Sequence, residues 1–271
     1  MNLFIVTACR NAEATIADTF ASLDEQREQW THYFIIDGIS SDATVPIARE
    51  FASTQGDSVT LLSEEDTGIY NAMNKGIRLA LKLANDEDLI GIINADDYYV
   101  SQALAVMTET ARAHPDIDVF YGDCELMDFR GRSTRKVAQS KSPLSRCAAE
   151  EGMPLEHPTM FVRARLYRKL GLYDETYRIA ADYDFVLRLI DAGASTRYLA
   201  VPIVRFREGG ISTSAIDESY QEAIRARVSH GADPHYENRR YRKQKFNEQL
   251  YALLHHIPGV EKLYNERYRS R

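Results

Sequence analysis

Cysteine is scarce in this sequence, with three residues in a chain of 271: Cys9, Cys124 and Cys147. An odd number of widely separated cysteines forms neither a disulfide framework nor the paired spacing of a zinc site, and it fits a reducing compartment. No histidine signature accompanies any of them, so a catalytic thiol is not indicated.

Long hydrophobic runs are also absent. No stretch of 18 apolar residues exists, so we expect no transmembrane helix. The start of the chain, "MNLFIVTACR", has no basic residues before an apolar stretch that is too short for a signal peptide. We therefore expect a cytoplasmic protein whose first residues form a strand.

Glycine is missing where two large enzyme classes need it. The segment after the first predicted strand, "TACRNAEAT", contains no glycine. A dinucleotide-binding oxidoreductase would have G-x-G-x-x-G at this point. A nucleotidyltransferase typically needs a glycine-rich, basic loop there for the triphosphate, so both classes are disfavoured, and the second is the main enzymatic alternative.

The net charge of −7 is unevenly distributed. Residues 223–271 carry 11 basic and 5 acidic side chains, for a net charge of +6, and the rest carries 22 basic and 35 acidic side chains, for −13. An acidic body argues against a broad nucleic-acid-binding face. The basic tail suits contact with an anionic surface.

What the sequence does contain is alternation of strand and helix. Short apolar, β-branched runs predict strands at 3–8 and 33–36 and in the stretches "SVTLLSEED" and "LIGIINADD", and the segments between them have helical spacing. In the third of these segments the residues Ile69, Met73, Ile77, Leu81 and Ala84 predict one buried helical face. This alternation predicts an α/β fold with a mostly parallel sheet and helices on both faces.

Polar residues follow each of these strands, where ligands bind in such sheets. They are Thr7 to Asn11, then Asp37, then Glu64 to Asp66, and finally Asp96 and Asp97. We expect them to converge on one crevice. Residues 117–215 are less regular, and beyond Ser214 the chain has the composition of helices.

Asp96 and Asp97 form the strongest local signal, because adjacent carboxylates repel each other. One of them alone would suit a helix cap. Two at a strand's carboxyl end fit a hard divalent cation, since Mg²⁺ or Mn²⁺ takes oxygen ligands and offsets the repulsion. Mg²⁺ binds one or two carboxylates together with substrate phosphates, so the pair predicts a nucleotide diphosphate in the crevice.

Eight stretches carry a resemblance to a known family. They are "VTACRNAEATI", "FIIDGISSDAT", "SEEDTGIYNAMNKGIRLA", "GIINADDYY", "VFYGD", "HPTMFVRARLYRKLGLYDE", "AADYDFVLRL" and "FREGGIS". In this order, over residues 3–214, the chain resembles the family 2 glycosyltransferases, inverting enzymes that use nucleotide sugars and have the Rossmann-like GT-A fold. The resemblance implies a UDP-sugar donor, Mg²⁺ or Mn²⁺ as cofactor, and a glycan or lipid-linked acceptor in bacterial surface polysaccharide synthesis.

The resemblance also implies the donor-site residues. They are Thr7, Ala8, Cys9 and Arg10 after the first strand, Asp37 as the acid that reads uracil or ribose, Asp66, Tyr70 and Asn74 around a helix start, Asp96 toward the ribose or sugar, and Asp97 toward the metal. Gly38 stands where many members have a second acid, which leaves the base contact open. Tyr70 and Asn74 have the alternative of lying on the helix surface.

On the acceptor side, the resemblance implies Asp182 as the general base, with Asp184 as its rival. Inversion requires a carboxylate that takes the proton of the acceptor hydroxyl. Either acid could instead interact with the helix dipole. His157 and Arg207 match site positions, although a structural histidine and a salt-bridged arginine are the alternatives.

We expect a GT-A domain over residues 1–215, with a nucleotide-binding half (1–100) and an acceptor half (101–215), followed by a basic helical extension (216–271). The extension either packs on the domain or docks on the inner face of a membrane. The non-enzymatic alternative is a nucleotide-sugar or glycan-binding module without catalysis. We expect no nucleic-acid partner.

Overall fold

The computed structural model describes residues 1–128, 130–139, 145, 149–150, 152–207, 209 and 215–254. It forms two compact units, Met1–Ala223 and Ile224–Arg271. The strands are β1 (Leu3–Cys9), β2 (His32–Asp37), β3 (Val59–Ser63), β4 (Leu89–Ile92), β5 (Tyr98–Tyr99), β6 (Val119–Met127), β7 (Ser133–Val137), β8 (Phe161–Arg163) and β9 (Thr196–Arg207). The helices are α1 (Ile16–Asp24), α2 (Thr44–Gln55), α3 (Ile69–Leu83), α4 (Ala103–Ala113), α6 (Ala164–Leu170), α7 (Ala181–Asp191), α9 (Ile216–Ser229) and α10 (Pro234–Leu254), with short 3₁₀ turns η1 (Arg27–Gln29), η2 (Gly56–Ser58) and η3 (His157–Thr159).

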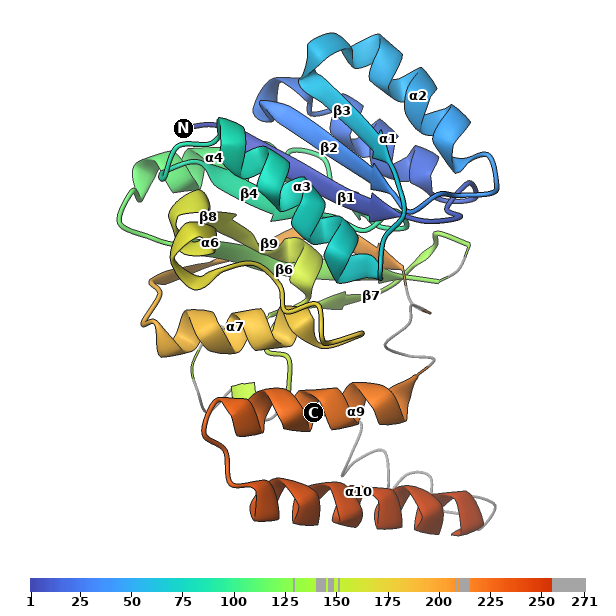
Figure 1. Ribbon diagram of the computed structural model, residues 1–271, viewed down its shortest axis with the longest axis vertical. Coiled ribbons are helices and arrows are strands. Elements are labelled where there is room, and N and C mark those ends of the chain that lie inside the picture. Colours follow the sequence, from blue (N-terminus) through green and yellow to red (C-terminus); the bar gives the residue numbers. More distant parts are fainter. Residues whose placement is uncertain are drawn as a thin grey trace. The chain divides into compact units, whose positions relative to one another are not determined.

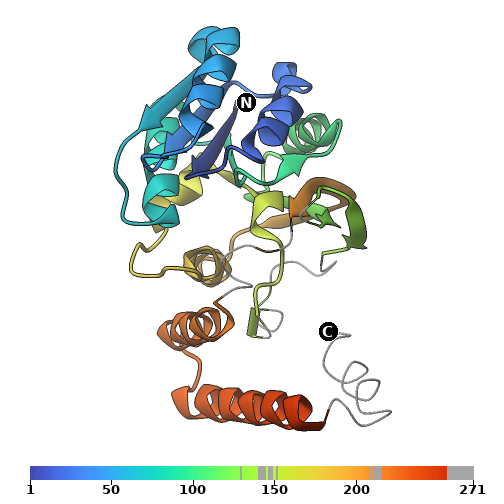
Figure 2. The same ribbon diagram turned by 90° about the vertical axis from the view of Figure 1, so that its right-hand side faces the viewer.

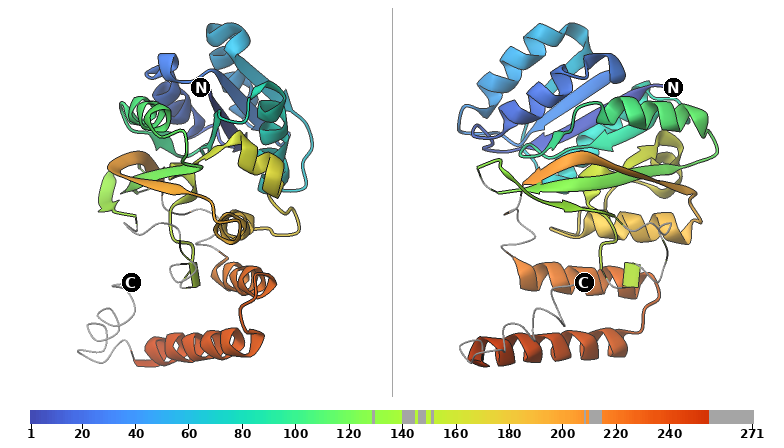
Figure 3. Two further views of the ribbon diagram at one scale, coloured as in Figure 1. Left: turned by 90° about the vertical axis from the view of Figure 1, so that its left-hand side faces the viewer. Right: turned by 180° about the vertical axis from the view of Figure 1, so that it is seen from behind.

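The predicted α/β architecture is confirmed (Figure 1). The described strands form one nine-stranded sheet in the order β3-β2-β1-β4-β8-β6-β9-β5, with β7 beside β6. The first four strands are all parallel, as the strand–helix alternation predicts. Beyond β4 the sheet is mixed: β8 runs antiparallel to β4 and β6, whereas β9 runs parallel to β6. Figure 3 shows β6 and β9 side by side along their length.

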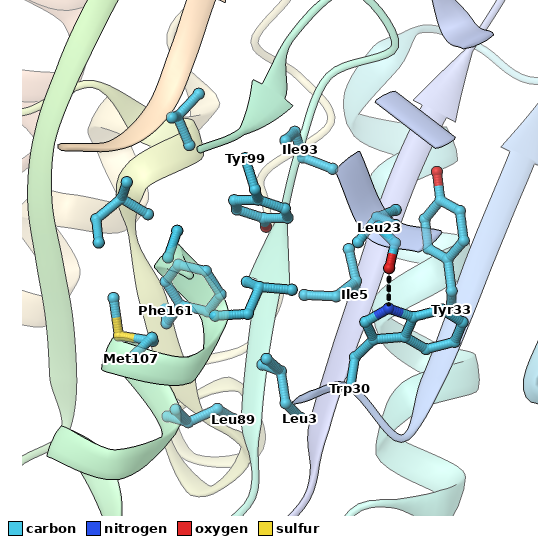
Figure 4. Packing of buried hydrophobic residues seen from close by; sticks show 14 of the residues in the cluster. Leu3, Ile5, Leu23, Trp30, Tyr33, Leu89, Ile93, Tyr99, Met107 and Phe161 are labelled. Carbon is cyan, nitrogen blue, oxygen red and sulfur yellow. Dashed lines mark hydrogen bonds between the residues drawn. The ribbon is translucent and has the colours of Figure 1, made fainter. Parts of the chain in front are cut away.

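Helices cover both faces of this sheet (Figure 2). Alternate side chains of β1 serve the two faces, because successive residues of a strand point to opposite sides. Leu3 and Ile5 join the core under α1 and α4, where Figure 4 shows Leu23, Trp30 and Met107 around them. Val6 points to the other face, toward α3.

Helix α3 lies unusually close to the sheet, and a glycine makes this possible. A Cβ on Gly76 would lie 2.3 Å from Cγ1 of Val6 on β1. Met73 and Ile77 are buried as the helical spacing predicts. Ile69, by contrast, is 37% exposed at the first position of α3.

The described part of the second unit contains the end of α9 and helix α10. Arg227 on α9 and Glu237 on α10 form a buried ion pair, with Nη2 and Oε2 2.8 Å apart. None of the helices in the described part of the chain combines the length and the apolar character that crossing a membrane requires.

Candidate functional site

The carboxyl ends of the first three strands of the sheet lie in register. Cys9 at the end of β1 is paired with Asp37 at the end of β2, and Asp37 is paired with Ser63 at the end of β3. The loops that follow these strands therefore leave the sheet at one edge, as the sequence predicts.

Asp37 is fully buried at this edge, and both of its carboxylate oxygens are occupied. Oδ1 accepts hydrogen bonds from the Ser40 hydroxyl (2.5 Å) and, weakly, from the Cys9 thiol (4.0 Å). Oδ2 accepts from the Ser40 N–H (3.1 Å) and from the Ser63 hydroxyl (2.7 Å). A carboxylate has about four acceptor positions, so Asp37 is saturated by the protein itself.

Asp66 lies beside Gly38, the residue that follows Asp37 in the chain. Its Oδ1 accepts a hydrogen bond from the Gly68 N–H at 2.9 Å. A Cβ built on Gly38 would lie 2.1 Å from Oδ2 of Asp66 and 3.5 Å from Cδ of Arg10. The structure thus brings together Asp66, Arg10 and the end of β2, three of the regions that the sequence assigns to the donor.

The loops after β1 and β2 hold each other in place. The Asn11 N–H donates to Oγ of Ser40 (2.8 Å), and the Ser41 N–H donates to Oδ1 of Asn11 (2.9 Å). Asn11 and Ile39 both have positive φ, 52° and 55°. For a β-branched residue such as Ile39 this backbone conformation is strained, and strain of this kind clusters at functional sites.

Three residues predicted to touch the donor have buried side chains. Thr7 is fully buried, and Ala8 and Cys9 are almost so, because all three belong to β1 rather than to the loop after it. Burial, followed by the nearby Asp37, raises the pKa of Cys9 to about 12, so its thiol is protonated at neutral pH. Of this predicted group, only Arg10 is exposed.

The Asp96–Asp97 pair follows β4 as predicted, but its two members differ in environment. Asp97 is fully buried, and its oxygens accept hydrogen bonds from the Arg207 N–H and from Nδ2 of Asn94, both at 2.8 Å. Asp96 is only partly buried, and no other described residue donates a hydrogen bond to its carboxylate. Burial, followed by Asp96, raises the pKa of Asp97 well above its usual range, and burial also raises the pKa of Asp96.

Arg207, at the end of β9, runs along this turn. Its Nε donates to the Asp96 carbonyl at 3.1 Å, and its Nη2 pairs with Oδ2 of Asp18 on α1 at 3.1 Å. Its positive charge lowers the pKa of Asp96, against the larger effect of burial. Arg207 therefore contacts the turn that carries Asp96 and Asp97.

The two aspartates fit a hard divalent cation. Their donor set is two carboxylates whose burial and mutual repulsion a cation would relieve. Within the described residues no group of three or more histidine, cysteine, aspartate or glutamate side chains is arranged to hold a metal. The pair therefore suits a cation that takes its remaining ligands from substrate phosphates and water.

The two candidate bases on α7 are clearly separated by the structure. Asp182 is partly exposed, and its Oδ1 lies 3.0 Å from the hydroxyl of Tyr70, which also bonds the Ile179 carbonyl. Asp184 is buried, and its Oδ2 pairs with Nε of Arg188 at 2.9 Å, one turn along the helix. Asp184 therefore has a structural partner, and Asp182 is the accessible carboxylate. Tyr70, predicted at the donor, contacts the candidate base instead.

Asn74 and His157 are both buried in structural contacts. Asn74 donates from Nδ2 to the Tyr173 carbonyl (2.9 Å) and to Oε1 of Glu175 (2.8 Å), and it accepts from the Tyr173 N–H (3.0 Å). Both N–H groups of its amide are therefore bonded within the protein, and its oxygen keeps one further acceptor position. Nε2 of His157 lies 2.7 Å from the Tyr173 hydroxyl, and burial lowers the pKa of His157, with Asp182 opposing this effect.

Sequence reasoning missed two glutamates. Glu222 on α9 accepts three backbone N–H bonds from the segment just before α7, from Arg178 (2.8 Å), Ile179 (2.7 Å) and Ala180 (2.9 Å). Glu156 lies in electrostatic range of both Asp182 and Asp97, and burial, followed by Asp182, raises its pKa. The only signal for Glu156 was its place next to His157, and the sequence offered none for Glu222.

Known proteins resemble this chain in sequence and in fold. The PGL/p-HBAD biosynthesis glycosyltransferase of Mycobacterium bovis (strain BCG / Pasteur 1173P2) is 28% identical over 222 residues, which are 81% of this chain and 82% of that protein. TarS 1–349 of S. aureus in complex with UDP-GlcNAc has a TM-score of 0.64 at 17% identity, over 88% of this chain and 69% of that one. Mannosyltransferase PcManGT from Pyrobaculum calidifontis, in complex with GDP-Man and Mn²⁺, has a TM-score of 0.61 at 17% identity, over 86% and 65%.

These two solved structures share the fold of this chain, which is the predicted GT-A fold. The model of the family described as glycosyl transferase family 2 matches residues 4–171, more than half of the sequence and the part that carries the strand ends described above. The chain belongs to glycosyl transferase family 2.

Proposed function

We propose that this glycosyltransferase is an inverting enzyme that moves a sugar from a UDP-sugar to a hydroxyl group of a glycan or lipid-linked acceptor. The observation that carries the proposal is the placement of Asp182. A partly exposed carboxylate at the start of α7 is hydrogen-bonded to Tyr70 on α3, the helix that follows the donor-side loop. A base next to the nucleotide half is what transfer with inversion requires.

In this mechanism the acceptor hydroxyl gives its proton to the carboxylate of Asp182. The hydroxyl oxygen forms a bond to the anomeric carbon while the bond from that carbon to the diphosphate breaks on the opposite face, and the nucleoside diphosphate leaves with the electron pair. Tyr70 and the segment before α7 keep Asp182 in position for the proton. Asp184 supports α7 through Arg188.

We propose Mg²⁺ or Mn²⁺ as the cofactor, with Asp96 rather than Asp97 as its main protein ligand. Asp97 already accepts two hydrogen bonds and is fully buried, whereas the Asp96 carboxylate is accessible. Asp97 would then fix the turn that presents Asp96. When bound, the cation stabilises the negative charge that develops on the departing diphosphate.

We further propose that residues 1–100 bind the nucleotide, that residues 101–215 bind the acceptor, and that residues 216–271 form a basic extension. His157 would line the acceptor side through its contact with Tyr173. We propose that the protein acts in the cytoplasm, in the synthesis of bacterial surface polysaccharide, and that its basic extension can contact an anionic membrane. Binding to anionic vesicles that disappears at high salt would support the membrane contact. Binding that does not respond to salt would contradict it.

A thermal-shift panel of nucleotide sugars, with and without Mn²⁺, tests the donor class, because ligands that bind the folded state raise its melting temperature. We expect UDP-sugars with Mn²⁺ to give the largest shift. Asp182→Asn should keep this shift and lose transfer. If transfer survives in Asp182→Asn, the assignment of the base is wrong. Wild-type protein that binds donors but neither transfers nor hydrolyses them would favour the binding-module alternative, and reaction with a nucleoside triphosphate would favour the nucleotidyltransferase.

A further inference from the structure

The chain places one acid, Asp37, at the end of β2, but the fold places a second carboxylate, that of Asp66, next to it. The Asp66 carboxylate occupies the volume that a side chain at position 38 would fill, since a Cβ there would lie 2.1 Å from Oδ2 and 3.1 Å from Cγ of Asp66. An acid from the loop after β3 thus stands where an acid following Asp37 in the chain would otherwise stand.

The two carboxylates differ in what they can still bind. Asp37 is fully buried, and four donors already occupy its oxygens. Asp66 is partly exposed, and the Gly68 N–H holds its Oδ1 at 2.9 Å. Within the part of the chain that the structure describes, Oδ2 of Asp66 accepts no hydrogen bond. Asp66 therefore offers one oriented, open acceptor, and Asp37 offers none.

We propose that Asp66, and not Asp37, reads the nucleobase of the donor, and that it selects uracil. This inference rests on the proposed function, in that it names the base-reading residue of the same donor site. A carboxylate only accepts hydrogen bonds. Uracil presents a single ring N–H between two carbonyl groups, which matches one open oxygen. Guanine presents two adjacent donors and needs two acceptors, whereas cytosine and adenine present a bare ring nitrogen at this edge.

The residues on either side of the Asp66 carboxylate could stack against a planar base. Arg10 is exposed, and its Cδ lies 3.5 Å from the Cβ position of residue 38. Ile39 is 51% exposed although it is apolar, and its strained φ of 55° holds it in the loop next to Gly38. Bases stack on guanidinium planes and on apolar side chains. Asp37 then serves as the residue that positions the loop after β2 through Ser40 and Ser63.

Binding of nucleoside diphosphates in the presence of Mn²⁺ tests the proposal by calorimetry. We expect wild-type protein to bind UDP more tightly than GDP, and both more tightly than CDP or ADP. In Asp66→Asn the Gly68 N–H keeps the amide oxygen at the Oδ1 position, so the amide nitrogen turns toward the base and opposes the uracil N–H. UDP affinity should fall at least tenfold, since a hydrogen bond to a charged group is lost. CDP affinity should fall less.

A modified ligand and a relocated acid sharpen the test. N3-methyl-UDP lacks the ring N–H and should bind wild-type protein at least tenfold more weakly than UDP, and this penalty should disappear in Asp66→Asn. In Gly38→Asp/Asp66→Ala the carboxylate moves back to position 38 without a clash, and preference for UDP should return. The control is Asp57→Asn, which removes an exposed carboxylate at the opposite end of β3 and should leave affinity unchanged.

The outcomes separate the inference from the proposed function. If wild-type protein binds UDP and Asp66→Asn binds it within twofold of the same affinity, Asp66 does not read the base, although the donor class stands. The same conclusion follows if the N3-methyl penalty persists in a folded Asp66→Ala variant. If wild-type protein binds none of the four diphosphates, both the inference and the proposed function fail.

Discussion

Replacing Glu222 by alanine should impair transfer although this residue lies on α9, well beyond the residues that match the family model. Its carboxylate holds the N–H groups of Arg178, Ile179 and Ala180, the three residues directly before the helix that carries Asp182. Each hydrogen bond to a charged group contributes about 1.5–3 kcal/mol, and water can replace part of this because Glu222 is only partly buried. We expect about 2–3 kcal/mol less stabilisation of this segment.

A displacement of a catalytic group by about 1 Å can reduce the rate by roughly 100-fold. We therefore expect kcat of Glu222→Ala to fall by about 10- to 100-fold, with KM for the donor nearly unchanged and with the same pH profile, because the base itself is still Asp182. Steady-state transfer assays with varied donor measure this.

The matched control for this prediction is Glu218→Ala, one turn earlier on α9. It removes only an exposed pair with Arg178, which is worth roughly 0.2–1 kcal/mol. If kcat of Glu222→Ala stays within twofold of wild type, or if KM for the donor rises instead, Glu222 does not position the proposed base.

Three further predictions concern other parts of the chain. Asp96→Asn should remove the Mn²⁺-dependent part of UDP binding in a thermal-shift assay, whereas Asp97→Asn should mainly lower the melting temperature, and the reverse pattern would return the metal to Asp97. The hydrogen bond from Asn74 holds the pKa of Glu175 below 4.5, so the stability that the ionised Glu175 contributes is present above pH 4.5 and is lost as pH falls through the lower pKa of the folded state. Melting curves from pH 7 to 3.5 should therefore show the difference in melting temperature between wild type and Glu175→Gln shrinking with acid, and a growing difference would contradict this. Buried Arg163 donates to the carbonyls of Ile117, Glu87, Ala111 and His114, so Arg163→Met should reduce the free energy of unfolding by about 3–5 kcal/mol in urea titrations, and a loss below about 1 kcal/mol would show that water satisfies these carbonyls.

Local sequence pattern was sufficient to predict where the strands of residues 1–100 end. β1 to β4 alternate with helices in sequence, and parallel strands joined by helices end at one edge of a sheet, so the placement of Asp37, Asp66 and Asp96 after strands that end at this edge was predictable. The antiparallel insertion of β8 beside β4 was not predictable, because pairing between strands more than 60 residues apart leaves no periodic mark in either strand.

Which acid of each neighbouring pair is buried and which is accessible could be learned only from the structure. Asp96 and Asp97 are equivalent in a motif, and so are Asp182 and Asp184, yet in each pair one carboxylate is buried and bonded and the other is accessible. That difference arises from where the strand turn or the helix start meets the rest of the sheet. Asn74 shows the same limit, since its amide donates a hydrogen bond to the carbonyl of Tyr173, 99 residues away in the chain.

By itself the sequence determined the fold class of this protein, because alternating apolar periods are local properties that specify an α/β sheet, and the acids that follow the strands can be read directly. Tertiary structure alone decided which of these acids are buried and bonded and which are accessible. Packing sets solvation and hydrogen-bond partners, and these bring Asp66 into the space beside Gly38 and place Glu222 against the segment that carries Asp182.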